Sequence, residues 1–178
     1  MPDLLHPAVV HLPLGLALLM PLLLLLMAIL DGRGKLGRPA WLIALLVQFL
    51  IVLGSYAAIR TGEGEEDRVE RLVPHAALES HEEAAQVFAW AAAGLLALTL
   101  LPLLPLGSRF RRVLPFILFG LSIVVLALAL RTGKAGGDLV YIHQAPAARA
   151  GYELPAGPSP GPVLDEGAQR KERGGDSD

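Results

Sequence analysis

The chain has 178 residues, of which 53% are hydrophobic, and its mean hydropathy is +0.52. This composition is typical of a membrane protein. The formal net charge of -2 gives no electrostatic reason to expect nucleic acid as a partner. Because the chain contains no cysteine, it cannot form disulfides, thiolate–zinc sites, cysteine-held iron–sulfur clusters or thioether-linked haem.

Four segments are long and apolar enough to cross a bilayer, which takes about 20 helical residues. They comprise residues 7–30, 40–60, 84–106 and 113–131. The first segment has no positively charged stretch before it and is too long for a cleavable signal peptide, so we expect it in the mature protein. We therefore expect an all-α, polytopic four-helix bundle built from two helical hairpins.

The two short connections between these segments are basic. They carry Arg33, Lys35, Arg38, Arg109, Arg111 and Arg112. The positive-inside rule then places both connections in the cytoplasm and both chain termini on the periplasmic side of the bacterial inner membrane. Residues 144–178 are rich in Pro, Gly and Ala, so we expect a flexible outer tail after a transmembrane domain of residues 1–143. Docking of the tail to a neighbouring subunit is the alternative.

The two hairpins share one plan. His6 and His11 precede the first apolar run, and His75 and His81 precede the third at an offset of 69 to 70 residues. Arg-Thr-Gly follows the second segment at 60–62 and the fourth at 131–133. A fixed offset of this kind indicates an internal repeat. Thr-Gly at these two places also predicts helix ends, with Gly62 and Gly133 just beyond them.

All five histidines fall near the predicted outer face, and two of them suggest a haem site. In an up-down bundle the first and third helices run parallel and can lie diagonally across the core. His11 and His81 would then face each other at similar depth, as the two axial ligands of a haem b do. Small residues near them leave room for a flat ring. These are Gly15, Gly54, Ala57, Ala58, Ala84 and Ala85.

Arg60 and Arg131 occupy the outer level once in each half, where they could bind haem propionates bidentately. Helix-dipole interaction and snorkelling to the interface explain the same two arginines without a ligand. Interfacial polar contact is likewise the alternative for each histidine.

His6, His75 and His143 would form a second, shallower layer. They could hold a second haem, hydrogen-bond the first, or bind zinc, iron or copper together with glutamates. The glutamates are Glu79, Glu82 and Glu83. The run HEEAA at 81–85 is better explained as a helix N-terminus capped by Ser80. Residues 139–143 (LVYIH) favour a short extended cap over the bundle, which would bring His143 back toward the site. Met20 and Met27 share one helix face and are predicted to pack rather than to bind copper.

Three stretches resemble one family. HPAVVHLPLGLALL at 6–19, SHEEAAQVFAW at 80–90 and TGKAGGDLVYIH at 132–143 are similar to bacterial four-helix membrane proteins of the domain of unknown function numbered twenty-two thirty-one. The resemblance covers residues 4–143 and implies a four-helix membrane fold, with no established reaction. Family motif positions fall on His6, His11, His81, Gly136, Gly137, Tyr141 and His143. Gln144 stands where the family usually has Gly.

The leading functional hypothesis is a small b-type cytochrome with one or two haems near its outer face. It would pass electrons between the quinone pool, or a respiratory or photosynthetic complex, and a periplasmic carrier. Electron transfer requires a fixed cofactor and no nucleophile or acid–base pair, so we expect an electron-transfer or accessory protein rather than a stand-alone catalyst. The alternatives are a haem-free accessory subunit of a larger complex and a membrane protein that binds zinc or copper through His and Glu.

Overall fold

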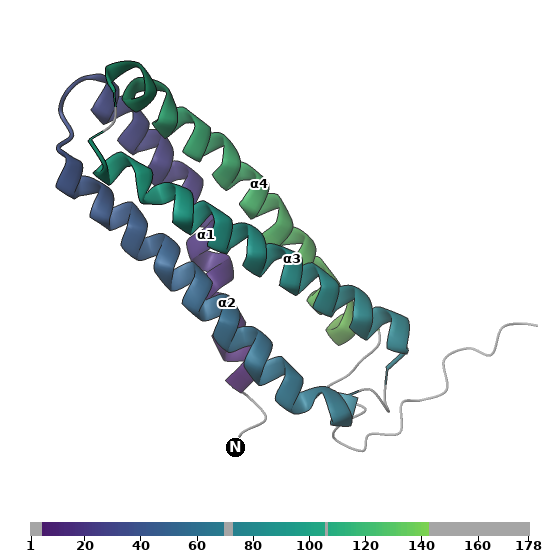
Figure 1. The fold of residues 1–178 in the computed structure, drawn as a ribbon. Coiled ribbons are helices and arrows are strands. Elements are labelled where there is room, and N and C mark those ends of the chain that lie inside the picture. The colour runs from purple at the N-terminus through teal and green to yellow at the C-terminus, as the bar shows by residue number, and fades with distance from the viewer. Residues whose placement is uncertain (1–4, 70–72, 106, 143–178) are drawn as a thin grey trace, which may run out of the picture.

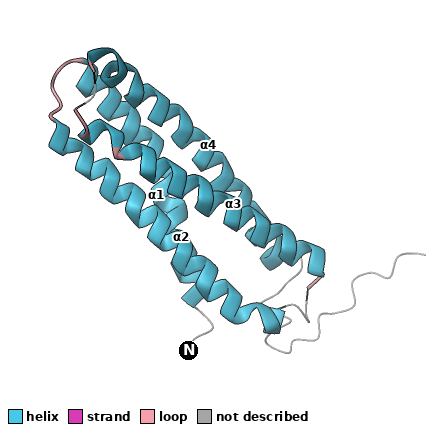
Figure 2. Cartoon of the chain, viewed as in Figure 1, coloured by secondary structure: helices cyan, strands magenta, loops and turns pink. Residues whose placement is uncertain are grey.

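The structure, a computed structural model, describes residues 5–69, 73–105 and 107–142. Within these ranges the chain is helical and contains no strand (Figures 1 and 2). The long helices are α1 (Leu5–Gly32), α2 (Trp41–Val69), α3 (His75–Thr99) and α4 (Ser108–Tyr141). Two short 3-10 helices, η2 (Arg38–Ala40) and η3 (Leu101–Leu103), lie in the connections at one end of the bundle.

Each long helix can cross a membrane. The candidate spans run over Ala8–Gly32, Arg38–Gly64, His75–Leu103 and Ser108–Tyr141. The shortest has 25 residues, which at a rise of 1.5 Å per residue exceeds a hydrocarbon core of about 30 Å. Many large apolar side chains point away from the bundle, as those of Leu22, Leu46 and Phe116 do. A helix that is apolar on all sides suits lipid surroundings.

The four helices form a ring in chain order. α1 packs on α2 and α4, and α3 packs on the same two neighbours (Figure 1). α1 and α3 therefore lie diagonally across the bundle, as the sequence predicts for an up-down arrangement. The core between them includes Met20, Leu24 and Met27 of α1, each at most 4% exposed. The prediction that the two methionines pack in the core is confirmed.

A tight turn ends α1. Lys35 N–H donates to Leu30 C=O at 2.9 Å and Gly34 N–H donates to Asp31 C=O at 2.9 Å, while Gly34 adopts φ +66°. This paired pattern with a left-handed residue is a Schellman cap. Glycine is favoured there because a Cβ would be strained at positive φ. The cap fixes the end of α1, whose last turn contains Asp31.

The predicted helix ends after Thr-Gly are wrong. α2 continues through Gly62 to Val69, and α4 continues through Gly133 to Tyr141. A glycine inside a helix costs only about 1 kcal/mol, and the packing of α4 on α3 outweighs that cost. The extended cap predicted for residues 139–143 is wrong over 139–141, which belong to α4, for the same reason, and His143 lies outside the described residues. Leu139 is 8% exposed within α4, so packing overrides the β-leaning composition of this stretch.

The predicted start of the third helix is also wrong. α3 begins at His75 after Pro74, whose φ is -59°, and Ser80 lies inside the helix rather than at its cap. Proline suits a helix start because its missing N–H would have no intrahelical partner there. Glu82 and Glu83 consequently lie beyond the first turn of α3.

Candidate functional site

The histidines of the two hairpins occupy equivalent helix positions. His11 is the seventh residue of α1, and His81 is the seventh residue of α3. The arginines repeat less closely, at Arg60 of α2 and Arg131 of α4. Both histidines lie toward the end of the bundle opposite the basic connections, because α1 and α3 start there (Figure 1).

Contacts through α4 show that His11 and His81 share one level. Thr132 Oγ1 of α4 donates to the carbonyl of Ala84 in α3 at 2.9 Å. The next residue, Gly133, faces Leu14 of α1, whose Cδ1 would lie 3.8 Å from a Cβ placed on the glycine. His11 and His81 each precede these contact residues by three positions, about one helical turn. The backbone positions of His11 and His81 therefore lie at the same depth in the bundle, on diagonal helices.

His81 is seated against the backbone of α4. A Cβ on Gly136 would lie 3.1 Å from Cε1 and 3.4 Å from Nδ1 of the His81 ring. The side chain is partly buried, and its Nδ1 atom is inaccessible to solvent. Glycine at 136 thus lets an imidazole pack directly on a helix, which gives the family-motif residues His81 and Gly136 a shared structural role.

His11 has a different environment. Its side chain is exposed, in contrast to the partly buried His81. Two residues further along α1, Pro13 packs closely on α2, with its Cδ 3.0 Å from a Cβ placed on Gly54. Gly15 faces open space, because nothing lies within 4 Å of a Cβ there. Gly54 therefore serves helix packing, while Gly15 leaves room beside His11.

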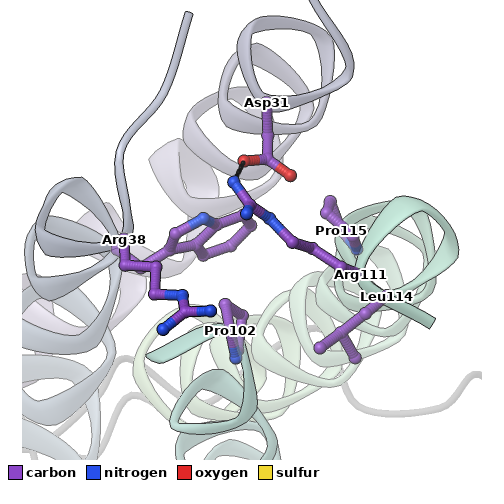
Figure 3. Close-up of a pocket in the computed structure, with 7 residues that line it drawn as sticks. Asp31, Arg38, Pro102, Arg111, Leu114 and Pro115 are labelled. Atoms are coloured by element: carbon purple, nitrogen blue, oxygen red, sulfur yellow. Dashed lines mark hydrogen bonds and ion pairs between the residues drawn. The ribbon is translucent and has the colours of Figure 1, made fainter. Parts of the chain in front are cut away.

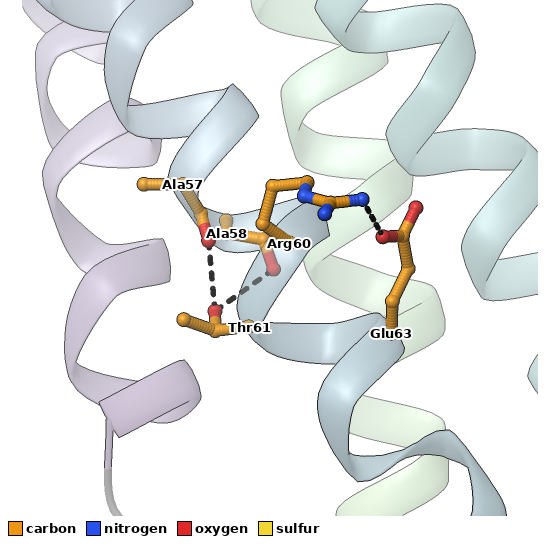
Figure 4. Close-up of polar contacts among 5 residues, drawn as sticks. All are labelled: Ala57, Ala58, Arg60, Thr61 and Glu63. Carbon is orange, nitrogen blue, oxygen red and sulfur yellow. Dashed lines mark hydrogen bonds and ion pairs between the residues drawn. The ribbon is translucent and has the colours of Figure 1, made fainter.

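The arginines lie at the surface of this end. Arg60 is 63% exposed and pairs with Glu63 at 2.7 Å (Figure 4). Arg131 is exposed on α4. Both positions suit binding of an anionic group at the bundle end, although Arg60 would have to exchange its Glu63 partner. Thr61, which follows Arg60, donates to the carbonyls of Ala57 and Ala58 in its own helix (Figure 4).

Of the second-layer histidines, His75 alone has a side chain among the described residues. His75 is 73% exposed and lies 3.8 Å from Glu79 on the same helix. His6 belongs to α1, but its side chain lies outside the described residues, as does all of His143. α4 runs straight through residue 141, so residues 132–141 do not fold back over the bundle as predicted. Among described residues, no three His, Asp or Glu side chains are grouped to hold a metal ion.

Two polar residues of the bundle were missed by the sequence analysis. Gln48 is fully buried in α2, and its Nε2 donates to the carbonyl of Ala92 in α3 at 2.9 Å, while its Oε1 has no partner among the described residues. Thr132 links α4 to α3 as described above. A single amide within the apolar run AWLIALLVQFL marks Gln48 in the sequence, because a polar side chain at membrane depth requires a partner.

Fold and site together define a membrane-embedded four-helix bundle with paired histidines at one end. The family model described as "Predicted membrane protein (DUF2231)" matches residues 2–149, and the chain belongs to this family. The resemblance seen in the histidine and glycine motifs is thereby confirmed. No curated protein and no solved structure matches the chain.

Proposed function

We propose that this protein is a small b-type cytochrome of the membrane, in which His11 and His81 hold a haem near the end of the bundle where α1 and α3 begin. The observation that carries the proposal is the matched level of these two imidazoles on diagonal helices, fixed by the Thr132–Ala84 and Gly133–Leu14 contacts. Two neutral imidazoles on opposite helices are a ligand set that suits a low-spin haem iron.

The surroundings fit a flat ring in two further respects. Two glycines near the histidines face open space, with nothing within 4 Å of a Cβ placed on them. They are Gly15, beside His11, and Gly137, next to the Gly136 on which His81 packs. Exposed Arg131 lies near the end of the bundle, where it could pair with a propionate. When bound, the haem would supply one-electron chemistry, and the chain would supply its ligands, its orientation and its apolar surroundings.

As its role we propose transfer of electrons between the quinone pool or a larger membrane complex and a carrier at the end where the histidines lie. The place of His11 near the start of α1 supports this, because electron transfer to an external carrier needs a cofactor near the membrane surface.

The test is the visible spectrum of the full chain purified in detergent from cells supplied with haem precursor. We expect a Soret band that shifts on reduction and a pyridine haemochrome of b type. His81→Ala and His11→Ala should each remove the low-spin spectrum, whereas His75→Ala, at an exposed position on α3, should retain it. Added imidazole should restore the spectrum of His81→Gly, because the free ligand can occupy the vacated space.

A low-spin spectrum that survives both ligand substitutions would show that the ligands are elsewhere. A colourless protein with stoichiometric zinc or copper would instead identify a metal-binding protein. A colourless and metal-free protein that co-purifies with respiratory or photosynthetic subunits would identify an accessory subunit. Each of the last two results would overturn the haem proposal.

A further inference from the structure

The end of the bundle opposite the histidines contains a small hollow between the ends of α1, η2, α2, η3 and α4. Its charged lining consists of Asp31, Arg38 and Arg111, and Trp41, Pro102 and Pro115 form apolar walls (Figure 3). Arg111 donates to Asp31 Oδ1 at 3.3 Å, and the Asp31 side chain is only 7% exposed. This pair joins the C-terminal end of α1 to the N-terminal end of α4.

The hollow lies in a strongly positive part of the molecule. Residues 31–41 and 100–112 contain one carboxylate, Asp31, and six cations. The cations are Arg33, Lys35, Arg38, Arg109, Arg111 and Arg112. Asp31 is paired with Arg111, and no described carboxylate forms an ion pair with Arg38. Arg38 and the remaining N–H donors of Arg111 therefore face the hollow with a net positive charge.

The place of the hollow in the fold points to a lipid rather than a soluble anion. It lies where membrane-length helices end, which is the level of phospholipid headgroups. Large apolar side chains near these helix ends are about half exposed and would contact acyl chains. They are Leu42 at 52%, Leu104 at 50%, Phe110 at 49% and Val113 at 50%. A ligand with one anionic phosphate and apolar chains matches both the cations that line the hollow and the apolar side chains around it.

We propose that Arg38 and Arg111, which are exposed at the opening of this hollow, bind the phosphate of an anionic membrane phospholipid. Arg38 and Arg111 donate charge-assisted hydrogen bonds to the phosphate oxygens, and Asp31 holds the Arg111 guanidinium in place. The bound lipid would bridge α1, η2 and α4 at this end, so that it stabilises the helix ends as well as binding to them.

Native mass spectrometry of the full chain tests this proposal. The protein is transferred from detergent into equal amounts of phosphatidylglycerol and phosphatidylcholine, and the retained lipids are counted. We expect one phosphatidylglycerol molecule to be retained in preference. Arg38→Gln should weaken its retention about fivefold, as loss of one arginine near an anionic lipid does. Because this variant keeps the Asp31–Arg111 ion pair, the buried Asp31 carboxylate still has its cationic partner.

Two variants with the same change of charge serve as controls. Arg109→Gln lies at the same end outside the hollow, and Lys134→Gln lies near the opposite end of α4. Both should change phosphatidylglycerol retention by less than twofold. Equal losses in Arg38→Gln and Arg109→Gln would overturn the proposal, because they would indicate diffuse attraction rather than a site.

A final arm separates the lipid from inorganic phosphate. Thermal unfolding of the delipidated protein is followed with phosphatidylglycerol or with inorganic phosphate at the same concentration. A rise of the melting temperature with phosphatidylglycerol alone, reduced in Arg38→Gln, supports the lipid. An equal rise with inorganic phosphate would overturn it in favour of a soluble anion.

Discussion

At the scale of single residues, two adjacent glycines of α4 have different surroundings although both lie in the same turn of helix. A Cβ on Gly136 would lie 3.1 Å from His81 Cε1, and a Cβ on Gly137 would have nothing within 4 Å. The glycine at 136 is therefore explained by the imidazole packed on it. The glycine at 137 has no such neighbour in the described part of the chain.

This difference predicts that alanine has different effects on stability at the two glycines. Gly137→Ala should stabilise the protein by about 0.5–1 kcal/mol, because alanine favours the helix over glycine. Gly136→Ala should lose this gain, because its methyl group displaces the His81 ring by a few tenths of an ångström. Thermal unfolding in detergent measures the first effect, and the imidazole NMR signals of His81 report the second. Equal stabilisation by both substitutions, with unchanged His81 signals, would contradict the close contact.

At the scale of helices, polar contacts within the apolar bundle join particular pairs. Thr132 links α4 to α3, and Gln48 links α2 to α3, each through a backbone carbonyl of α3. Such interhelical bonds are worth about 0.6 kcal/mol on average in a membrane. Their larger effect is on register, because each bond holds one helix at one height relative to its neighbour. The register set by Thr132 is the one that places His81 level with His11.

Substitution of Thr132 separates this link from ordinary helix packing. Thr132→Val keeps the shape of the side chain but removes the hydroxyl contacts to Ala84 in α3 at 2.9 Å and to Leu128 within α4 at 3.0 Å, so we expect a loss of about 0.5–1 kcal/mol in unfolding free energy. Thr99→Val is the matched control. Thr99 is also buried in the bundle, but its hydroxyl donates to Leu95 within α3 itself at 2.7 Å. Denaturant unfolding in mixed micelles should show the smaller loss for Thr99→Val, and a reversed order would contradict the interhelical role.

The number and approximate positions of the long helices could be predicted from the sequence, because long apolar runs determine them. Runs of about 20 apolar residues leave few alternatives, and each of the four segments overlaps one of the long helices, although α3 ends at Thr99 within the segment predicted over 84–106, before the 3-10 helix η3. The ends were less predictable, because Thr-Gly at 61–62 and 132–133 is a local signal that tertiary packing outweighs. Residues 139–141 form helix for the same reason, since Leu139 finds a buried place that no local pattern reveals.

The candidate site could likewise be predicted only in part from the sequence. The matched level of His11 and His81 could be predicted, because a repeat offset of 70 residues carries equal helix positions into both hairpins. The packing of His81 on Gly136 could not be predicted. It depends on how α3 is rotated against α4, and the sequence of two apolar helices does not determine that rotation. The exposure of His11 depends in the same way on the rotation of α1 against its neighbours α2 and α4. The hollow around Arg38 and Arg111 likewise requires the folded helix ends.

At the scale of the whole molecule, the charge distribution separates the two ends of the bundle. The end with the α1–α2 and α3–α4 connections carries six cations against one carboxylate. The opposite end carries the paired histidines and charges of both signs, with Glu63, Glu79, Glu82 and Glu83 alongside Arg60, Arg131 and Lys134. The positive-inside rule therefore predicts that the hollow with Arg38 faces the cytoplasm and the histidines face the periplasm.

The absence of cysteine from the chain makes this orientation directly measurable, because one introduced thiol is the only one present. Lys35→Cys marks the basic end and Glu79→Cys marks the histidine end, and both native side chains are exposed. A membrane-impermeant maleimide added to spheroplasts should label Glu79→Cys and leave Lys35→Cys unlabelled, and both should react once the membranes are opened. The reverse pattern would place His11 and His81 on the cytoplasmic side, where the proposed haem could not serve a periplasmic carrier. The predicted pattern would place that haem within reach of such a carrier and the lipid hollow in the cytoplasmic leaflet, whose anionic lipids carry the charge that Arg38 requires.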